Sequence, residues 1–112
     1  MTDAERMCAN VRDELRPHAV EIAESLEFMR VKLTETRKGL ANQAVVIPYD
    51  NGGGQTGIRA NPAFREFNAL MKTYTTTLER FTAMFAGTMD AKGQSALDRF
   101  KVLPMKLAVG DE

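Results

Sequence analysis

The residues of this chain that could do chemistry are few, and the most suggestive are its clustered glycines. Gly52, Gly53, Gly54 and Gly57 have the composition of a phosphate-binding loop. Such a loop needs a lysine directly after its last glycine to meet the phosphate charge, and no lysine stands there. A dinucleotide site needs a strand and a helix around its glycines within a βαβ unit, and that context is also missing. A turn, in which glycine adopts positive φ at little cost, is the better interpretation.

The chain has one histidine, His18, and one cysteine, Cys8. Two such residues cannot supply the ligand set of a zinc site. A lone cysteine also excludes an internal disulfide, which makes a reducing compartment the default. The carboxylates of Glu21, Glu24 and Glu27 drift around a helix at three-residue steps, so we expect them to face water. Because no nucleophile, base and orienting group come together, we predict no catalytic residues, no metal, no cofactor and no enzyme.

The remaining chemistry is electrostatic. Fifteen basic and fifteen acidic side chains cancel, so the chain lacks the basic excess typical of nucleic-acid-binding proteins. The cancellation is uneven, because residues 1–29 carry a net charge of −4 and residues 30–106 a net charge of +6. This polarity favours head-to-tail contacts between copies or a polarised surface. The plainer alternative is that the charges keep each helix face in water.

Basic residues gather in two places, near residues 30–38 and in the tail from residue 92 onwards. Each contact with a phosphate releases counterions, and copies repeated around a ring would add their contributions. At helix ends such residues also complement the negative end of the helix dipole, which is their plainer role. The DNA-binding candidates are Arg30, Lys32, Arg37, Lys38, Lys92, Arg99, Lys101 and Lys106.

Two apolar stripes predict the elements that must position these residues. Their steps alternate between four and three residues, the repeat by which two helices pack along one seam, as in a coiled coil. We therefore expect a mainly α protein, with a long antiparallel helical hairpin formed by helices over residues 17–41 and 61–86. The stripes are Leu15, Ala19, Ile22, Leu26, Met29, Leu33, Thr36 and Leu40, followed by Phe64, Phe67, Met71, Tyr74, Leu78, Phe81 and Phe85.

Residues 44–59 predict a short β-hairpin at the tip of the helical hairpin. A β-branched, apolar run precedes the glycine turn, and a second short run follows it. Asn61 can then cap the next helix, with Pro62 at its first position. An isolated two-stranded hairpin is marginal in water, so it must lean on the helix ends or on a neighbouring subunit.

Short helices are expected at both ends of what we take as a single helical domain over residues 1–112. Pro17 either starts a new helix after one that stops near Glu14 or kinks a continuous helix, and we prefer the break. In the tail over residues 88–112, Ser95 is expected to cap a short helix that Pro104 closes. No apolar run approaches the ~20 residues of a membrane span. The acidic start of the chain is unlike a signal peptide, so we predict a cytoplasmic protein that contacts no membrane.

Several apolar residues lie off the seam. They widen the apolar surface beyond what one partner helix covers, which indicates a homo-oligomer. The predicted oligomer interface comprises Val20, Phe28, Val31, Leu70 and Met84.

This order of elements resembles the small subunits of phage terminases. The resemblance covers about residues 15–86, and its most specific part is the Asn-Gly-Gly turn at residues 51–53 combined with Asn61 and Pro62. It implies an oligomer, often a ring, that binds viral DNA at the start of packaging and delivers it to the ATP-hydrolysing large subunit. Members of the family often carry a DNA-binding segment before the hairpin. Only about fifteen residues precede Pro17 here, so the tail over residues 92–106 is the substitute candidate.

We therefore expect a non-enzymatic DNA-packaging component, encoded by a phage or prophage and acting in the bacterial host cell. Its expected partners are further copies of itself, the terminase large subunit and double-stranded DNA. The alternative is a helical interaction or scaffold module of a phage or mobile element with no DNA-binding role, which the neutral net charge favours.

Overall fold

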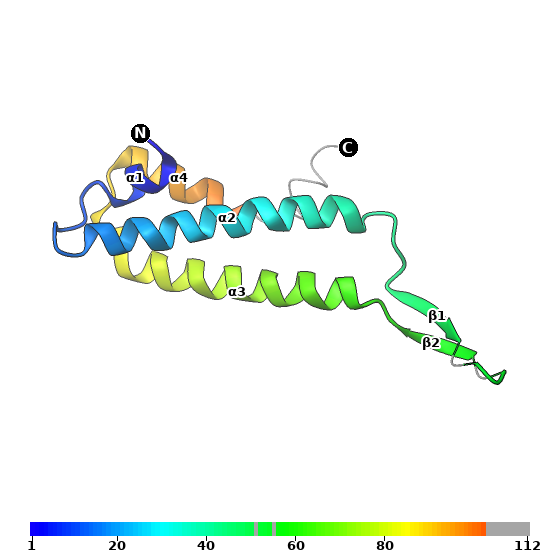
Figure 1. The fold of residues 1–112 in the computed structure, drawn as a ribbon. Coiled ribbons are helices and arrows are strands. Elements are labelled where there is room, and N and C mark those ends of the chain that lie inside the picture. The colour runs from blue at the N-terminus through cyan, green and yellow to red at the C-terminus, as the bar shows by residue number, and fades with distance from the viewer. Residues whose placement is uncertain (51, 55, 103–112) are drawn as a thin grey trace.

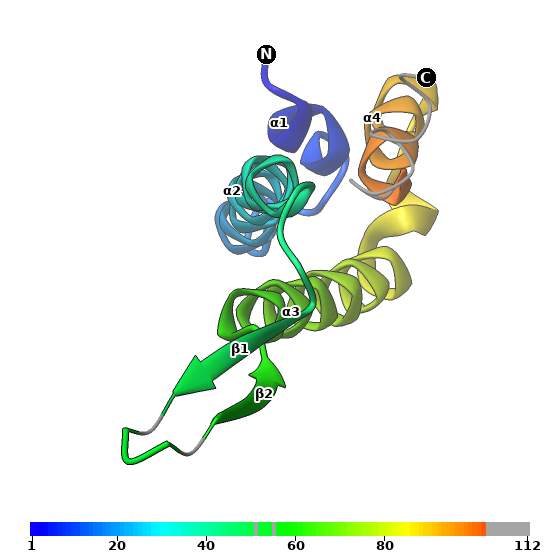
Figure 2. The ribbon, with the colours of Figure 1, turned by 90° about the vertical axis from the view of Figure 1, so that its right-hand side faces the viewer.

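The computed structural model describes residues 1–50, 52–54 and 56–102, and it is mainly helical (Figure 1). The long helices α2 and α3 pack together as the predicted helical hairpin, and the β-hairpin extends beyond their ends. α1 and α4 pack against each other at the opposite end of α2 (Figure 2). The elements are α1 (Asp3–Cys8), α2 (Arg16–Leu40), β1 (Val46–Asp50), β2 (Thr56–Ala60), α3 (Pro62–Phe85), the 3₁₀ turn η1 (Ala86–Thr88) and α4 (Ala91–Lys101).

The predicted break at Pro17 is confirmed, because α2 begins at Arg16 with Pro17 in its first turn. The predicted end of the first helix near Glu14 is wrong, since α1 already ends at Cys8. The chain turns there so that Val11 can bury its side chain, and Nη2 of Arg16 donates to the Val11 carbonyl oxygen at 2.7 Å. Leu15 consequently occupies the N-cap position of α2 without a side-chain hydrogen bond and lies exposed, instead of joining the seam as predicted.

The seam between α2 and α3 is the centre of the core. α2 contributes small and branched side chains, and α3 contributes aromatic ones that fill the space between the helices. The Phe81 and Phe85 rings lie 5.2 Å apart, centroid to centroid, in a tilted arrangement that favours ring–ring contact. The fully buried side chains of this seam are Ala19, Ala23, Leu26, Leu33, Tyr74 and Phe81.

Asn61 joins the β-hairpin to α3, as predicted. Its Oδ1 accepts a hydrogen bond from the backbone N–H of Ala63 at 3.1 Å, which caps the helix. Its Nδ2 donates to Oε1 of Gln43 and to the carbonyl oxygen of Ala44, so the side chain also holds the segment that enters β1. The glycine turn is confirmed as well, because Gly52 to Gly54 all have positive φ.

α4 starts earlier than the sequence predicts. Asp90 caps it by accepting from the backbone N–H of Gly93, and Ser95 lies inside the helix, so the predicted Ser95 cap is wrong. Gly93 explains this choice, because a Cβ there would lie 2.9 Å from the Arg6 carbonyl oxygen of α1. Because Gly93 has no side chain, the backbones of α4 and α1 can approach each other closely at this position. Pro104, the predicted end of this helix, lies outside the described residues.

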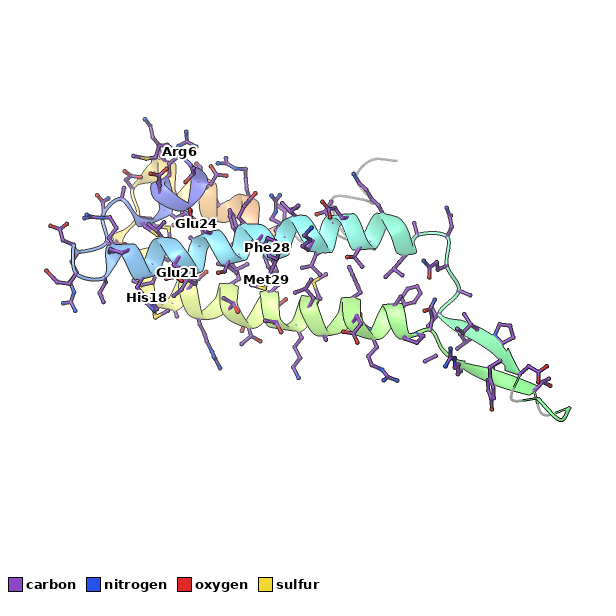
Figure 3. All side chains as sticks on the ribbon, viewed as in Figure 1. Arg6, His18, Glu21, Glu24, Phe28 and Met29 are labelled. Atoms are coloured by element: carbon purple, nitrogen blue, oxygen red, sulfur yellow. The ribbon has the colours of Figure 1, made fainter. Side chains whose placement is uncertain are left out.

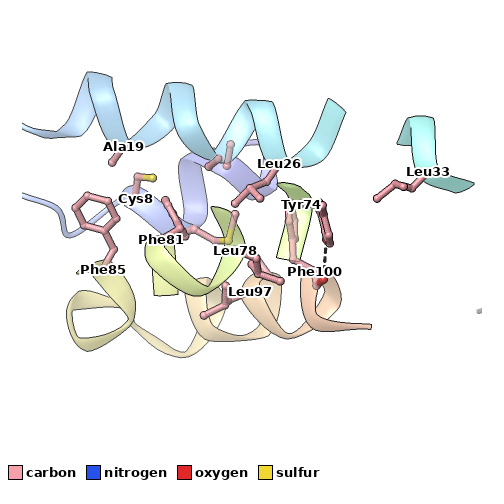
Figure 4. Close-up of a cluster of buried hydrophobic side chains, with 14 of the residues drawn as sticks. Cys8, Ala19, Leu26, Leu33, Tyr74, Leu78, Phe81, Phe85, Leu97 and Phe100 are labelled. Carbon is pink, nitrogen blue, oxygen red and sulfur yellow. Dashed lines mark hydrogen bonds between the residues drawn. The ribbon is translucent and has the colours of Figure 1, made fainter. Parts of the chain in front are cut away.

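Tyr74 connects three helices. Its fully buried ring lies in the seam of α3, and its hydroxyl donates to the Phe100 carbonyl oxygen at 2.7 Å (Figure 4). Phe100 and Leu97 of α4 are fully buried in the same cluster. Burial raises the pKa of Tyr74 to about 12, so the hydroxyl stays protonated and can donate throughout the physiological range.

The substitution Tyr74→Phe should destabilise the protein, because it leaves the buried Phe100 carbonyl without this donor. We expect the free energy of unfolding to fall by about 1–2 kcal/mol, measured by urea denaturation. Tyr49→Phe is the matched control, since the Tyr49 side chain is exposed on the β-hairpin and its hydroxyl makes no hydrogen bond to the described residues. Equal effects of the two substitutions would contradict a structural role for the Tyr74 hydroxyl.

Candidate interaction surfaces

The predicted oligomer interface divides into two sets in the structure. Phe28 and Val31 on α2 and Met84 on α3 are exposed, with Phe28 at 63%. Val20 and Leu70 are half-buried and pack against the core of their own chain. The exposed large apolar side chains on the helices are therefore Phe28, Val31 and Met84, whereas Val20 and Leu70 already have contacts within the chain.

Phe28 is the most exposed of these three residues. It lies on the side of α2 away from the seam, along the same helix as Glu21 and Glu24 (Figure 3). Nζ of Lys32 lies 5.6 Å from the Phe28 ring centroid, within the range of a cation–π contact. The exposed ring is thus surrounded by charges, as at the rim of a protein–protein interface.

The β-hairpin carries a second apolar surface, which the sequence-based interface did not include. Val45, Val46 and Ile58 are exposed, Ile58 at 71%. In the strand register, Val46 faces Ala60 and Pro48 faces Ile58, so these side chains share one face of the two-stranded sheet. The continuous apolar run over residues 44–49 puts apolar side chains on both faces of a strand, and this signal could have identified the face from the sequence.

Four of the eight predicted DNA-binding residues, Arg30, Lys32, Arg99 and Lys101, have partners within the chain. Nη2 of Arg99 lies 2.7 Å from Oδ1 of Asp3, and the Lys101 and Lys32 ammonium groups lie near Asp98 and Glu35. The Arg30 guanidinium lies 5.8 Å from the Phe100 ring centroid, and Arg37 is half-buried. Lys106 lies outside the described residues. These contacts reduce the positive charge that is free to meet a ligand.

Lys38 and Lys92 are exposed, and no acidic side chain of the described residues forms an ion pair with either. Lys92 and Arg99 are brought together, since they line one shallow, open depression with Arg6 and Ser95. Lys38 lies at the far end of α2, near the β-hairpin. The predicted basic residues therefore form no single continuous site.

Sequence reasoning missed a basic row on α3. Arg65, Lys72 and Arg80 are exposed, and their seven- and eight-residue spacing places them on one side of the helix at intervals of about 10–12 Å. Within the described part of the chain, none of the three forms an ion pair. Glu66 and Glu79 on the same helix partly offset this charge. The heptad-like spacing was the available signal.

Three features of the described residues bear on metal binding, on nucleophilic chemistry and on membrane spans. In the described ranges, no group of three or more His, Cys, Asp or Glu side chains is placed to hold a metal ion. Burial raises the pKa of the Cys8 thiol to about 11, so the thiol stays neutral and a weak nucleophile. None of the described helices has the length and apolar character that crossing a membrane requires.

The fold defines a helical-hairpin protein with a β-hairpin at its tip and two short helices at its base. The chain matches no protein-family model, no curated protein and no solved structure. Its functional interpretation therefore depends on its own surfaces.

The ion pair between Asp3 and Arg99 is expected to make the stability of the fold depend on pH. Hydrogen bonds from Arg99 and Arg6 lower the pKa of Asp3 below its usual 3.8. The pair therefore stabilises the fold above the pKa of Asp3 in the unfolded chain, and this contribution is lost as pH falls through the lower pKa of the folded state.

We expect Asp3→Asn to be less stable than the natural chain at pH 7, and the difference to shrink as the pH falls below about 4. Urea denaturation at a series of pH values measures this. Asp98→Asn is the control, since its carboxylate lies 3.9 Å from Lys101 on an exposed surface. A difference for Asp3→Asn that does not change with pH would contradict the assignment.

Proposed function

We propose that this chain is a non-enzymatic component of a phage DNA-packaging machine, resembling the small subunit of a terminase. It acts in the cytoplasm of the bacterial host and is encoded by a phage or prophage. It forms a homo-oligomer, and a ring is the form of this assembly that the family resemblance implies. The oligomer engages double-stranded viral DNA and the large motor subunit.

The observation that carries the proposal is the apolar surface left uncovered by a chain of this size. The exposed apolar residues on the helices are Phe28, Val31 and Met84, and those on the β-hairpin include Val46 and Ile58. Exposed large apolar side chains favour contact with another protein, because contact removes them from water. An assembly of identical subunits is the simplest way to cover them.

The charges give weaker support to the DNA-binding part. A single chain offers few free cations, because Arg99, Lys101 and Lys32 all have acidic neighbours. An assembly multiplies those that remain, Lys38 and Lys92 together with the α3 row, and DNA affinity rises with each phosphate contact. The same ion pairs favour the second candidate, a scaffold module of a phage or mobile element that assembles without binding DNA.

The oligomer is tested by light scattering at several protein concentrations. We expect a mass above that of one chain, and a shift to lower mass when Phe28→Gln, Val31→Thr and Met84→Gln are combined, since these changes remove apolar surface without adding charge. Glu21→Gln is the control on α2. A monomer at every concentration would refute the assembly.

The DNA-binding part is tested by fluorescence anisotropy with labelled duplex DNA at low and moderate salt. We expect salt-sensitive binding that weakens for Lys38→Gln combined with Lys92→Gln, with the salt slope reduced by about 0.9 for each lost phosphate contact. The triple variant Arg65→Gln, Lys72→Gln and Arg80→Gln separates the α3 row from this pair, and Lys101→Gln is the control. An assembled protein that binds no DNA at any salt would favour the scaffold module.

A further inference from the structure

The hydrogen-bonding pattern of the β-hairpin determines which backbone groups face outward. The backbone N–H of Asn61 donates to the Val45 carbonyl oxygen at 2.7 Å, one position beyond the Val46–Ala60 pair. In an antiparallel ladder, hydrogen-bonded and non-hydrogen-bonded pairs alternate. The Val46–Ala60 pair and the Pro48–Ile58 pair are therefore non-hydrogen-bonded, and their backbone N–H and C=O groups point away from the hairpin.

The two outer edges of the hairpin differ in their capacity to pair. At the centre of the β1 edge stands Pro48, which has no N–H to donate. On the β2 edge, Thr56, Ile58 and Ala60 each present an N–H and a C=O. An added strand can form a regular ladder along β2, whereas Pro48 interrupts one along β1.

Among the described residues, the hairpin makes few contacts with the helices. Figure 2 shows β1 and β2 extending away from the helices, and Ile58 is 71% exposed. A two-stranded sheet is marginal in water, and three or more strands with a shared apolar face are stable. An additional strand on the β2 edge would extend the apolar face formed by Val46, Pro48 and Ile58.

We propose that β2 pairs with β2 of a second copy of this chain, antiparallel and centred on Ile58, so that two β-hairpins form one four-stranded sheet. The proposal rests on the strand edges alone and is independent of any role in DNA packaging.

The position of Arg59 favours a second copy of this chain as the partner, with its β2 strand antiparallel. In the antiparallel register Ile58 faces Ile58 of the second copy, and Arg59 faces its Gly57. A Cβ on Gly57 would lie 2.9 Å from the Tyr49 ring, so that ring covers the glycine and would lie beside the incoming guanidinium as a cation–π partner. A parallel register centred on Ile58 would instead place the two Arg59 side chains opposite each other.

The paired sheet is closed by symmetry. Both of its outer edges are β1 strands, where Pro48 interrupts further pairing, so the contact joins two chains and stops. Two molecules of 64 Å length that overlap by a strand of about 17 Å extend to roughly 110 Å. A pair joined side by side through α2 and α3 would stay close to the length of one chain.

Disulfide trapping tests the register directly. In Ile58→Cys the two introduced thiols face each other across the two-fold axis, so we expect a covalent dimer under mild oxidation, formed roughly tenfold faster than in Thr56→Cys. Thr56 lies on the same edge of β2 but faces Ala60 of the second copy in this register, and is the matched control. Cys8 is fully buried, and the natural chain shows its background rate. Equal rates for the two variants would overturn the proposal.

Removing the edge donor provides a second test. Ile58→Pro deletes an outward N–H while keeping an apolar side chain, at the position opposite a natural proline. By small-angle X-ray scattering, we expect the maximum dimension of a concentrated sample to fall from roughly 110 Å to near that of one chain, whereas Ile58→Val keeps the long form. Circular dichroism checks that the helices of each variant are intact. A long form that survives Ile58→Pro would overturn the proposal.

The contact through the exposed helical residues and the pairing of β2 strands can be tested separately. The Phe28, Val31 and Met84 variant should leave the Ile58→Cys cross-link unchanged, because its substitutions lie on the helices. A loss of only the helical contact would remove the proposed ring and leave the hairpin pairing in place.

Discussion

The aromatic seam of α3 is the constraint on which the rest of the structure depends. On one side its rings fill the space left by the small side chains of α2, and through Tyr74 it also holds the end of α4. The last carbonyls of a helix have no partner within that helix, so a buried helix end needs an outside donor. The Tyr74 hydroxyl supplies one at Phe100, and the packing of α4 then covers α1.

The long helices could be predicted because their signals are local. A 3.5-residue repeat, Pro17 and the Asn61–Pro62 pair mark α2 and α3 within about a residue of their ends. The short helices could not be placed as well. Asp90 and Ser95 are both good caps, and the choice between them follows from the approach of Gly93 to α1, which lies far away in the sequence.

The residues of the candidate surfaces could likewise be predicted only in part. The sequence identifies which residues are charged or off the seam, and Phe28 is exposed as its position indicates. It does not show that Arg99 pairs with Asp3, or that Leu70 packs against the core of its own chain. The ion pair depends on the short helices α1 and α4, which add a layer to the two-helix seam.

The contact between α1 and α4 also has a consequence for the order of events during synthesis. Asp3 and Arg99 are 96 positions apart, yet they form one ion pair, and Met7 and Cys8 are buried in the shared core. On the ribosome, α1 emerges well before α4, which covers part of its apolar side. That part of α1 stays exposed to water until α4 has been synthesised, and during this interval it is a target for chaperone binding.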